Sequence, residues 1–372
     1  MNATPARSRE PYLHSLDLLR GLGAVAVCVY HISFMLTPGL QLLSGSYLCV
    51  DLFFLLSGFV IARTYDHQIA AGMTFRSFFI QRFARLYPLF IMATLIGFVV
   101  INARLYEIAH GYGGGLIYLT LLGNLLLIPN FLEPFGIRSM FPFNGASWSI
   151  FFEFAVNIPF FLFWRQLTSW RLVAVIAVNA MLLVFVAFHR HSLDLGSKTP
   201  DLLFSAPRVG FAFFLGVAIS RSKFGHSTRA FGAWTALLGM GVLSIIVFGH
   251  RWLPAAWVPL ADIAVVLGVM PALFLLFLRI DLVGIPERIA AFLGDVSYSV
   301  YLLQTPLIVA VSAIPRVLAH DEIAHYAPWA GFLFMPTIMT ISYFVWKYFE
   351  VPAKRAIRRW RPRTSRVLGE AV

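Results

Sequence analysis

The sequence has few charged residues and almost no cysteine. Only 12% of its 372 residues are charged, 59% are apolar, and two are cysteines. A soluble domain carries about twice that share of charge, and two cysteines exclude a disulfide-rich secreted scaffold. Mean hydropathy is +0.78, and apolar runs recur along the whole chain. The composition therefore predicts an all-α fold, a polytopic transmembrane helical bundle.

Acidic residues are also scarce, with 17 Asp and Glu against 29 Lys and Arg and a net charge of +12. In a soluble protein this excess would favour nucleic-acid binding. In a membrane chain it marks the cytoplasmic side instead. We therefore expect the lipid bilayer as a partner and no nucleic acid. Cys28 and Cys49 lie on neighbouring segments at different depths, so we expect two buried thiols and no disulfide.

Ten apolar segments are long enough to cross a hydrocarbon core of about 30 Å. The first follows a 13-residue polar leader and lacks a small-residue cleavage site, which predicts a retained span. An eleventh segment, 115–130, has only 16 residues and is predicted to be a short re-entrant or interfacial helix. The ten spans are 14–36, 47–63, 84–104, 147–164, 171–188, 202–220, 231–249, 258–278, 294–313 and 329–348.

The number of spans follows from the charge at the two ends. Ten spans place the basic leader and the basic tail on one side of the membrane, whereas eleven would separate them. The positive-inside rule favours ten. We therefore expect one membrane domain over 1–372 in the inner membrane, with a cytoplasmic leader (1–13) and a basic cytoplasmic tail (350–372).

Two ionisable residues stand out in the first span because such side chains are costly at bilayer depth. Arg20 and His31 are 11 residues apart, so they share one helix face about 16 Å apart. A snorkelling arginine and a hydrogen-bonded core histidine are the ordinary alternatives. His31, Asp51 and Glu153 are predicted to lie at one level near the outer side. One carboxylate would orient the imidazole, which would take a proton from a hydroxyl.

Further candidates lie at the ends of other spans. Arg82 and Arg85 are one helical turn apart and can grip a phosphate, although any cytoplasmic helix end collects arginines. Arg208 is another intramembrane cation that could orient an acceptor. Trp148 is predicted near the outer surface, where an aromatic belt and sugar stacking are the two explanations.

Five motifs in chain order resemble those of acyltransferase family 3, integral-membrane enzymes that O-acylate bacterial surface saccharides and some small molecules. The late motif departs from the pattern, since Gln304 precedes Thr305 and Pro306 where many members carry a histidine. The five motifs are 16–21 followed by His31, 50–59, 82–88, 147–150 with Glu153, and 297–303.

The resemblance implies a donor, an acceptor and a set of site residues. The donor would be acyl-CoA, with acetyl-CoA expected, the acceptor a saccharide or lipid-linked hydroxyl, and no metal would take part. Whether transfer is direct or passes through an acyl-histidine stays open. The implied catalytic residues are His31, Asp51, Glu153 and Arg20; the donor phosphates would meet Arg82, Arg85 and Arg20; the acceptor would meet Arg208, Trp148, Tyr301 and Gln304.

Two other functions fit part of the sequence. A secondary transporter of an anionic metabolite could use Arg20, Arg208 and the carboxylates. The chain shows no internal repeat, however, and its acidic groups are predicted near the outer face instead of the midplane. A non-catalytic protein that binds lipid surfaces through the basic residues of 354–366 is the weaker alternative.

Overall fold

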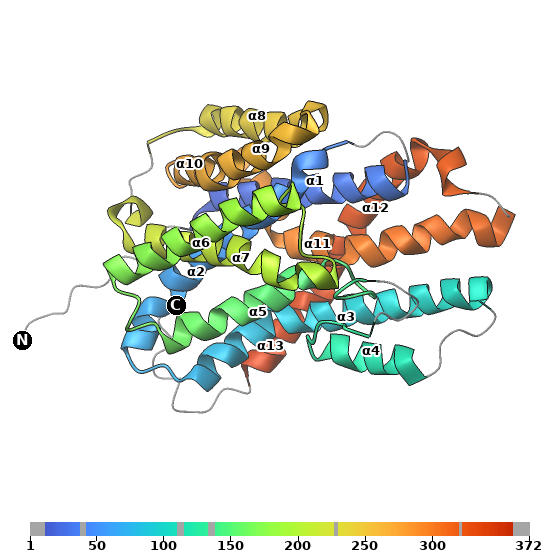
Figure 1. Cartoon of the computed structure of the whole chain (residues 1–372), viewed down its shortest axis with the longest axis horizontal. Helices are drawn as coiled ribbons and strands as arrows, with labels where there is room; N and C mark the ends of the chain where they lie inside the picture. Colours follow the sequence, from blue (N-terminus) through green and yellow to red (C-terminus); the bar gives the residue numbers. More distant parts are fainter. Residues whose placement is uncertain are drawn as a thin grey trace, which may run out of the picture.

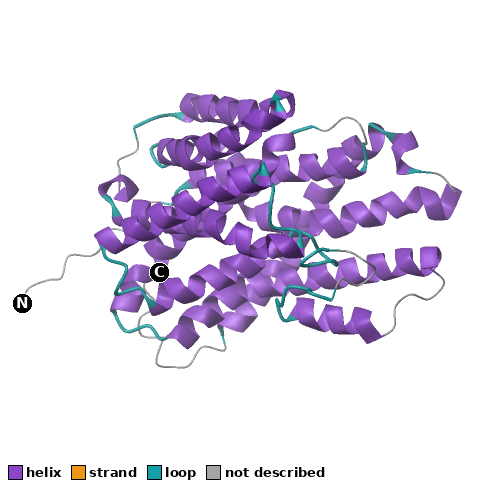
Figure 2. Ribbon diagram, in the orientation of Figure 1, coloured by secondary structure: helices purple, strands orange, loops and turns teal. Residues whose placement is uncertain are grey.

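The computed structural model describes residues 12–37, 42–109, 115–132, 138–226, 230–319 and 322–359. Most of the expected leader and much of the expected tail therefore lie outside the described residues. Within them the chain forms helices and loops, with two isolated β-bridges and no strand (Figure 2). The helices are α1 (His14–Met35), α2 (Cys49–Ala70), α3 (Phe75–Ala109), α4 (Gly115–Leu125), α5 (Ser147–Leu162), α6 (Ser169–Arg190), α7 (Leu202–Arg221), α8 (Ala233–Gly249), α9 (Val258–Ala264), α10 (Met270–Phe277), α11 (Ile285–Ala319), α12 (Trp329–Val345) and α13 (Val351–Arg358).

The predicted membrane fold is confirmed. Nine stretches of the described residues are long and apolar enough to cross a bilayer, and each corresponds to an expected span. The tenth, 147–164, is α5, which has only 16 residues and is about 24 Å long. The short segment 115–130 contains α4, with 11 residues, which is too short to cross, as expected.

The expected end of the second span and the expected start of the third were both wrong, because the two helices are longer than the apolar segments. The segment expected as a loop between residues 63 and 85 is mostly helix, because α2 continues to Ala70 and α3 begins at Phe75. The polar residues of this segment suggested a loop. They belong instead to the ends of α2 and α3, which continue beyond the apolar part of each helix.

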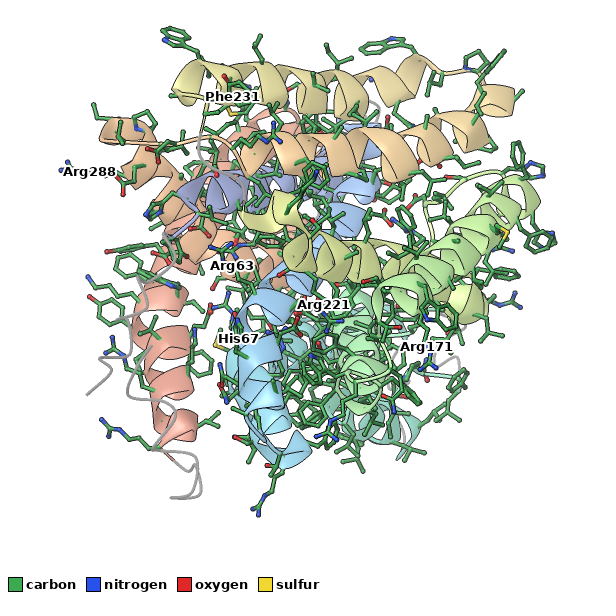
Figure 3. All side chains as sticks on the ribbon, turned by 90° about the vertical axis from the view of Figure 1, so that its left-hand side faces the viewer. Arg63, His67, Arg171, Arg221, Phe231 and Arg288 are labelled. Atoms are coloured by element: carbon green, nitrogen blue, oxygen red, sulfur yellow. The ribbon has the colours of Figure 1, made fainter. Side chains whose placement is uncertain are left out.

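The helices lie side by side along the longest axis of the molecule (Figure 1). α1 packs mainly on α11, and α2 on α7, while α8 and α4 lie at opposite edges of the bundle. The start of α1 and the connections α2–α3, α5–α6 and α7–α8 lie at the left-hand end of Figure 1. Figure 3 views that end, where Arg63, Arg171, Arg221 and Arg288 lie.

Glycines allow α2 and α7 to pack with their backbones in contact. A Cβ on Gly58 would lie 1.9 Å from the carbonyl oxygen of Phe213, and one on Gly216 would lie 2.1 Å from that of Leu55. Small residues give this close approach in membrane bundles, where apolar burial does not by itself drive helices together. The contact fixes the position of α2, which contributes to the site below.

Candidate active site

A cavity of about 150 Å³ lies between α1, α2, α3, α5 and α11. Most of its wall is apolar, as expected for a small-molecule site with a few placed polar groups. The structure thus brings together five of the predicted site residues from four helices. The polar residues of the wall are Arg20, Ser57, Arg82, Arg85, Ser149, Glu153, Ser297, Tyr298 and Tyr301.

Arg82 forms an ion pair with a carboxylate of the protein. Its guanidinium donates to Glu153, which also accepts from the Ser57 hydroxyl at 3.0 Å. The Arg82 side chain is only 10% exposed. Arg82 therefore holds Glu153 in the cavity wall and is poorly placed to bind a second anion.

Arg20 and Arg85 are more accessible, with side chains 31% and 33% exposed. Arg85 lies 3.5 Å from a carboxylate oxygen of Glu350, a loose contact. Arg20 pairs with Asp17 at 2.8 Å and also donates to the Ser297 hydroxyl at 3.0 Å. The Arg20–Asp17 pair is the ordinary alternative named from the sequence. Arg20 and Arg85 are nevertheless the two arginines that an anion entering the cavity can reach.

His31 lies about 16 Å along α1 from Arg20. Its Nδ1 is 2.9 Å from the carbonyl oxygen of Val27. A carbonyl only accepts, so Nδ1 carries the hydrogen and Nε2 keeps the lone pair that a general base needs. The side chain of Gln304, on α11, lies near the imidazole.

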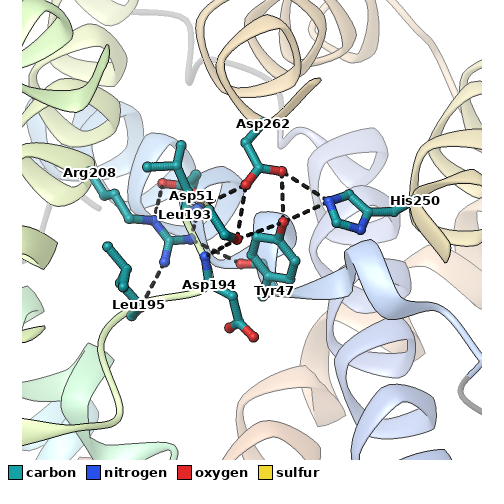
Figure 4. Close-up of polar contacts among 9 residues, drawn as sticks. Tyr47, Asp51, Leu193, Asp194, Leu195, Arg208, His250 and Asp262 are labelled. Atoms are coloured by element: carbon teal, nitrogen blue, oxygen red, sulfur yellow. Dashed lines mark hydrogen bonds and ion pairs between the residues drawn. The ribbon is translucent and has the colours of Figure 1, made fainter. Parts of the chain in front are cut away.

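The prediction that either Asp51 or Glu153 orients His31 is wrong for Asp51, because Asp51 pairs with Arg208 (Figure 4). Their side chains are each 2% exposed, with contacts at 2.5 and 3.1 Å. Arg208 also donates to the carbonyl oxygens of Leu195 at 2.7 Å and Tyr47 at 3.1 Å. A buried charge requires an opposite charge, and the packing of α2 on α7 supplies one. Arg208 is therefore enclosed, not exposed to an acceptor.

The prediction that Glu153 lies level with His31 is also wrong, since Glu153 bonds to Arg82. The expected depth assumed that α5 starts at the outer surface. Instead α5 starts inside the bundle: Ser147 is fully buried, and Asn144 before it donates to the carbonyl oxygen of Leu302. Glu153 therefore lies deeper than its position in the sequence suggested.

The predicted acceptor residues are buried as well. Trp148, expected near the outer surface, packs in the interior with the Arg208 guanidinium 5.8 Å from its ring. Tyr301 lines the cavity and donates to the Ser149 hydroxyl at 3.0 Å. Gln304 follows one turn later on α11. Contact of these residues with an acceptor stays a prediction.

Sequence reasoning missed a second buried polar cluster, centred on Asp262 (Figure 4). One carboxylate oxygen accepts from the Tyr47 hydroxyl at 2.6 Å and from His250 at 3.1 Å. The other accepts from Leu193 N–H at 2.7 Å and from the Ser192 hydroxyl at 3.2 Å. These bonds tie α9 to the loop after α6 and to the end of α8. An acid within the apolar run 258–278 was the available signal.

The part of the chain that the structure describes holds no group of three or more His, Cys, Asp or Glu suited to a metal ion. Cys28 and Cys49 are both free and buried, as expected.

Comparison with known proteins gives one family and several relatives. A family model described as an acyltransferase domain matches residues 13–347. "Protein 2 in picA locus" of Rhizobium radiobacter is 32% identical over 189 residues, covering 46% of this chain and 93% of the relative. "Acyltransferase MdmB" of Streptomyces mycarofaciens is 34% identical over 163 residues, 41% of this chain and 39% of the relative.

"Peptidoglycan O-acetyltransferase OatA" of Listeria monocytogenes is 29% identical over 240 residues, 62% of this chain. The match covers 34% of that relative, so this chain spans well under half the length of both named enzymes. No solved structure matches.

Proposed function

The chain belongs to acyltransferase family 3, whose model covers residues 13–347, and on this premise we propose that it transfers an acetyl group from acetyl-CoA to a saccharide hydroxyl. The coarser activity, that of a multi-pass membrane O-acyltransferase, follows from family membership and from relatives named as O-acetyltransferases. Family membership also overturns the transporter alternative. The donor, the acceptor and the direction of transfer are the parts proposed here.

The observation that carries the proposal is the cavity whose wall holds three arginines, one of them, Arg20, on the same helix as His31, which lies outside the lining. The accessible guanidinium groups of Arg20 and Arg85 suit the phosphates of a coenzyme A donor. Binding there would exchange the loose contact of Arg85 with Glu350 for stronger contacts with phosphate oxygens. The extended pantetheine arm could then cover the approximately 16 Å between the levels of Arg20 and His31.

The transfer needs one general base, with the acceptor hydroxyl and the thioester placed beside it. His31 Nε2 takes the proton from the acceptor hydroxyl while the hydroxyl oxygen attacks the thioester carbonyl carbon. A carbon–oxygen bond forms and the carbon–sulfur bond breaks. The leaving thiolate then takes the proton from His31, so the histidine returns to its neutral state. An acyl-histidine at the same nitrogen would use the same arrangement in two steps.

The test compares surface glycans by mass spectrometry, in cells that express the full chain and in cells that lack it. We expect a mass increment of one acetyl group on a glycan only where the wild-type chain is present, and loss of that increment in His31→Ala. His67→Ala is the matched control, because His67 is exposed in the last turn of α2, at the end of the molecule viewed in Figure 3. An increment that persists in His31→Ala at equal protein levels would end the proposed mechanism.

A further inference from the structure

Glu350 is a buried carboxylate with long contacts to its neighbours Arg85 and Ser299. It is only 4% exposed. One oxygen accepts from the Ser299 hydroxyl at 3.3 Å, and the other lies 3.5 Å from the Arg85 guanidinium. Asp51 and Asp262, which are equally buried, accept bonds as short as 2.5 and 2.6 Å. Because a buried charge normally has close partners, the loose arrangement at Glu350 requires an explanation.

The backbone at Glu350 is also unusual, because this residue ends a single π-helical turn. The turn spans Trp346–Glu350 and joins α12 to α13. Such turns are rare and are frequently found at functional sites. α13 in turn packs on α3, the helix that carries Arg85. The fold therefore places a loosely held carboxylate, on an irregular turn, beside an arginine of the cavity.

That arginine is the one proposed above for the donor phosphates. Arg85 lines the cavity, together with Tyr298, the residue before Ser299 on α11. The Arg85 side chain is 33% exposed, so an anion in the cavity can reach it. A carboxylate and a phosphate bind a guanidinium through the same N–H groups. Because both are anions, Glu350 and a phosphate also repel each other at close range.

We propose that Glu350 is an internal competitor of the donor, which pairs with Arg85 in the empty site and gives up this arginine to the phosphates. The inference rests on the proposed function, in which Arg85 binds acetyl-CoA. One ion pair within the protein is exchanged for one with the ligand, and no covalent bond changes. The long contacts of Glu350 suit this exchange, whereas a close pair such as that of Arg208 with Asp51 would be much harder to open.

The competition has a consequence for the end of the reaction. The product coenzyme A carries the same phosphates as the donor, so contacts with Arg85 alone would hold both equally well. Glu350 lowers the affinity for both and takes Arg85 back as the product leaves. It therefore favours product release, a step that limits the turnover of many enzymes.

The test measures binding of coenzyme A to the full chain in detergent micelles by isothermal titration calorimetry, and needs no acceptor. Glu350→Gln keeps the size of the side chain and removes its charge. We expect this variant to lower the Kd about fivefold, as expected for loss of one partly exposed ion pair that competes with the ligand. If Glu350 instead served to orient Arg85 for binding, the Kd would rise. An unchanged or raised Kd in Glu350→Gln would therefore overturn the inference.

Glu287→Gln is the matched control, because it removes the same charge near Arg288, at the end of the molecule viewed in Figure 3. The Glu287 side chain is 43% exposed and pairs with His14 at 3.2 Å. Its Kd should equal that of the wild type. A gain in Glu287→Gln as large as that in Glu350→Gln would show a general effect of charge and would contradict competition at Arg85.

A double variant tests whether the competition acts through Arg85. The gain from Glu350→Gln should largely disappear in the Arg85→Ala background, because the carboxylate then has no arginine to occupy. An undiminished gain would indicate repulsion at a distance and would also overturn the inference. Failure of the proposed function would appear differently, as absence of coenzyme A binding in the wild type and in every variant. That result would exclude the proposed donor, and this inference with it.

Discussion

Arg208 and Asp51 illustrate how single ionisable residues are held in this bundle. Each side chain is 2% exposed, and the guanidinium is bonded to both carboxylate oxygens and to two backbone carbonyls. Removal of one partner would leave an uncompensated buried charge. Replacement of both by apolar side chains removes the charge and its partner together. The pair therefore stabilises the structure conditionally, only while both members are present.

We expect Asp51→Leu to lower the free energy of unfolding by about 3–5 kcal/mol. The double variant Asp51→Leu/Arg208→Met should recover most of that loss. Unfolding of the detergent-solubilised Asp51→Leu, Arg208→Met and double variants, followed by circular dichroism, measures these free energies. The pairing would be contradicted if the loss in the double variant equalled the sum of the losses in the two single variants.

A second prediction at this scale tests one arginine of the cavity, Arg85. Arg85 is partly exposed and loosely paired, so Arg85→Ala should raise the KM for acetyl-CoA about tenfold, as expected for one lost charge-assisted contact, with little change in kcat. Steady-state kinetics at varied acetyl-CoA give both constants. Arg76→Ala, at an exposed position in the first turn of α3, is the control. A KM unchanged in Arg85→Ala would remove Arg85 from the donor site.

The sequence predicted which ionisable residues would lie at the site, but not which residues they would pair with. Arg20, Arg82, Arg85 and Glu153 do share one cavity. The pairing of Asp51 with Arg208 could not be derived, because it depends on which helices pack together, and helix rise reports depth alone. The proximity of Gln304 to His31 joins α11 to α1 across 273 positions of sequence and leaves no local signal.

At the scale of helices, the contact between α2 and α7 is set by two glycines. Gly58→Ala would place a methyl group 1.9 Å from a backbone carbonyl, which cannot move aside as a flexible side chain could. We expect a loss of about 1–3 kcal/mol in the free energy of unfolding, with reduced acyl transfer because α2 lines the cavity. Gly241→Ala on α8 meets nothing within 4 Å and is the matched control. Equal thermal stability of the two variants would contradict the close contact.

The sequence predicted helix bounds well where the length of the apolar run determines them. It predicted the depth of a helix poorly where the helix starts inside the protein. Long runs such as α6 and α8 lie close to their expected ranges. α5 is different, because its start is covered by the loop before it, where Asn144 bonds to α11. Hydropathy cannot tell a helix that begins at the membrane surface from one that begins inside the protein, so the depth assigned to Glu153 was wrong.

At the scale of the whole molecule, the cavity lies inside the bundle with Arg20 in its wall, and His31 lies about 16 Å further along α1. A donor that enters from one end and an acceptor that arrives from the other would meet at His31. Such an arrangement has a functional direction only if the molecule has a fixed orientation in the membrane. We expect the arginines near the end viewed in Figure 3 to fix this orientation, because positively charged loops are retained on the cytoplasmic side.

This orientation is testable with single cysteines introduced after Cys28 and Cys49 have been replaced. Ala71 follows α2 at the end where α1 begins, whereas Ala255 lies at the start of a short helix before α9, and both are exposed. A membrane-impermeant maleimide added to intact cells should label Ala255→Cys and leave Ala71→Cys unmodified, and permeabilisation should make both reactive. Labelling of Ala71→Cys in intact cells would place Arg20 and Arg85 on the outer side. Cytosolic acetyl-CoA could not then reach the arginines first, and the proposed direction of transfer would be wrong.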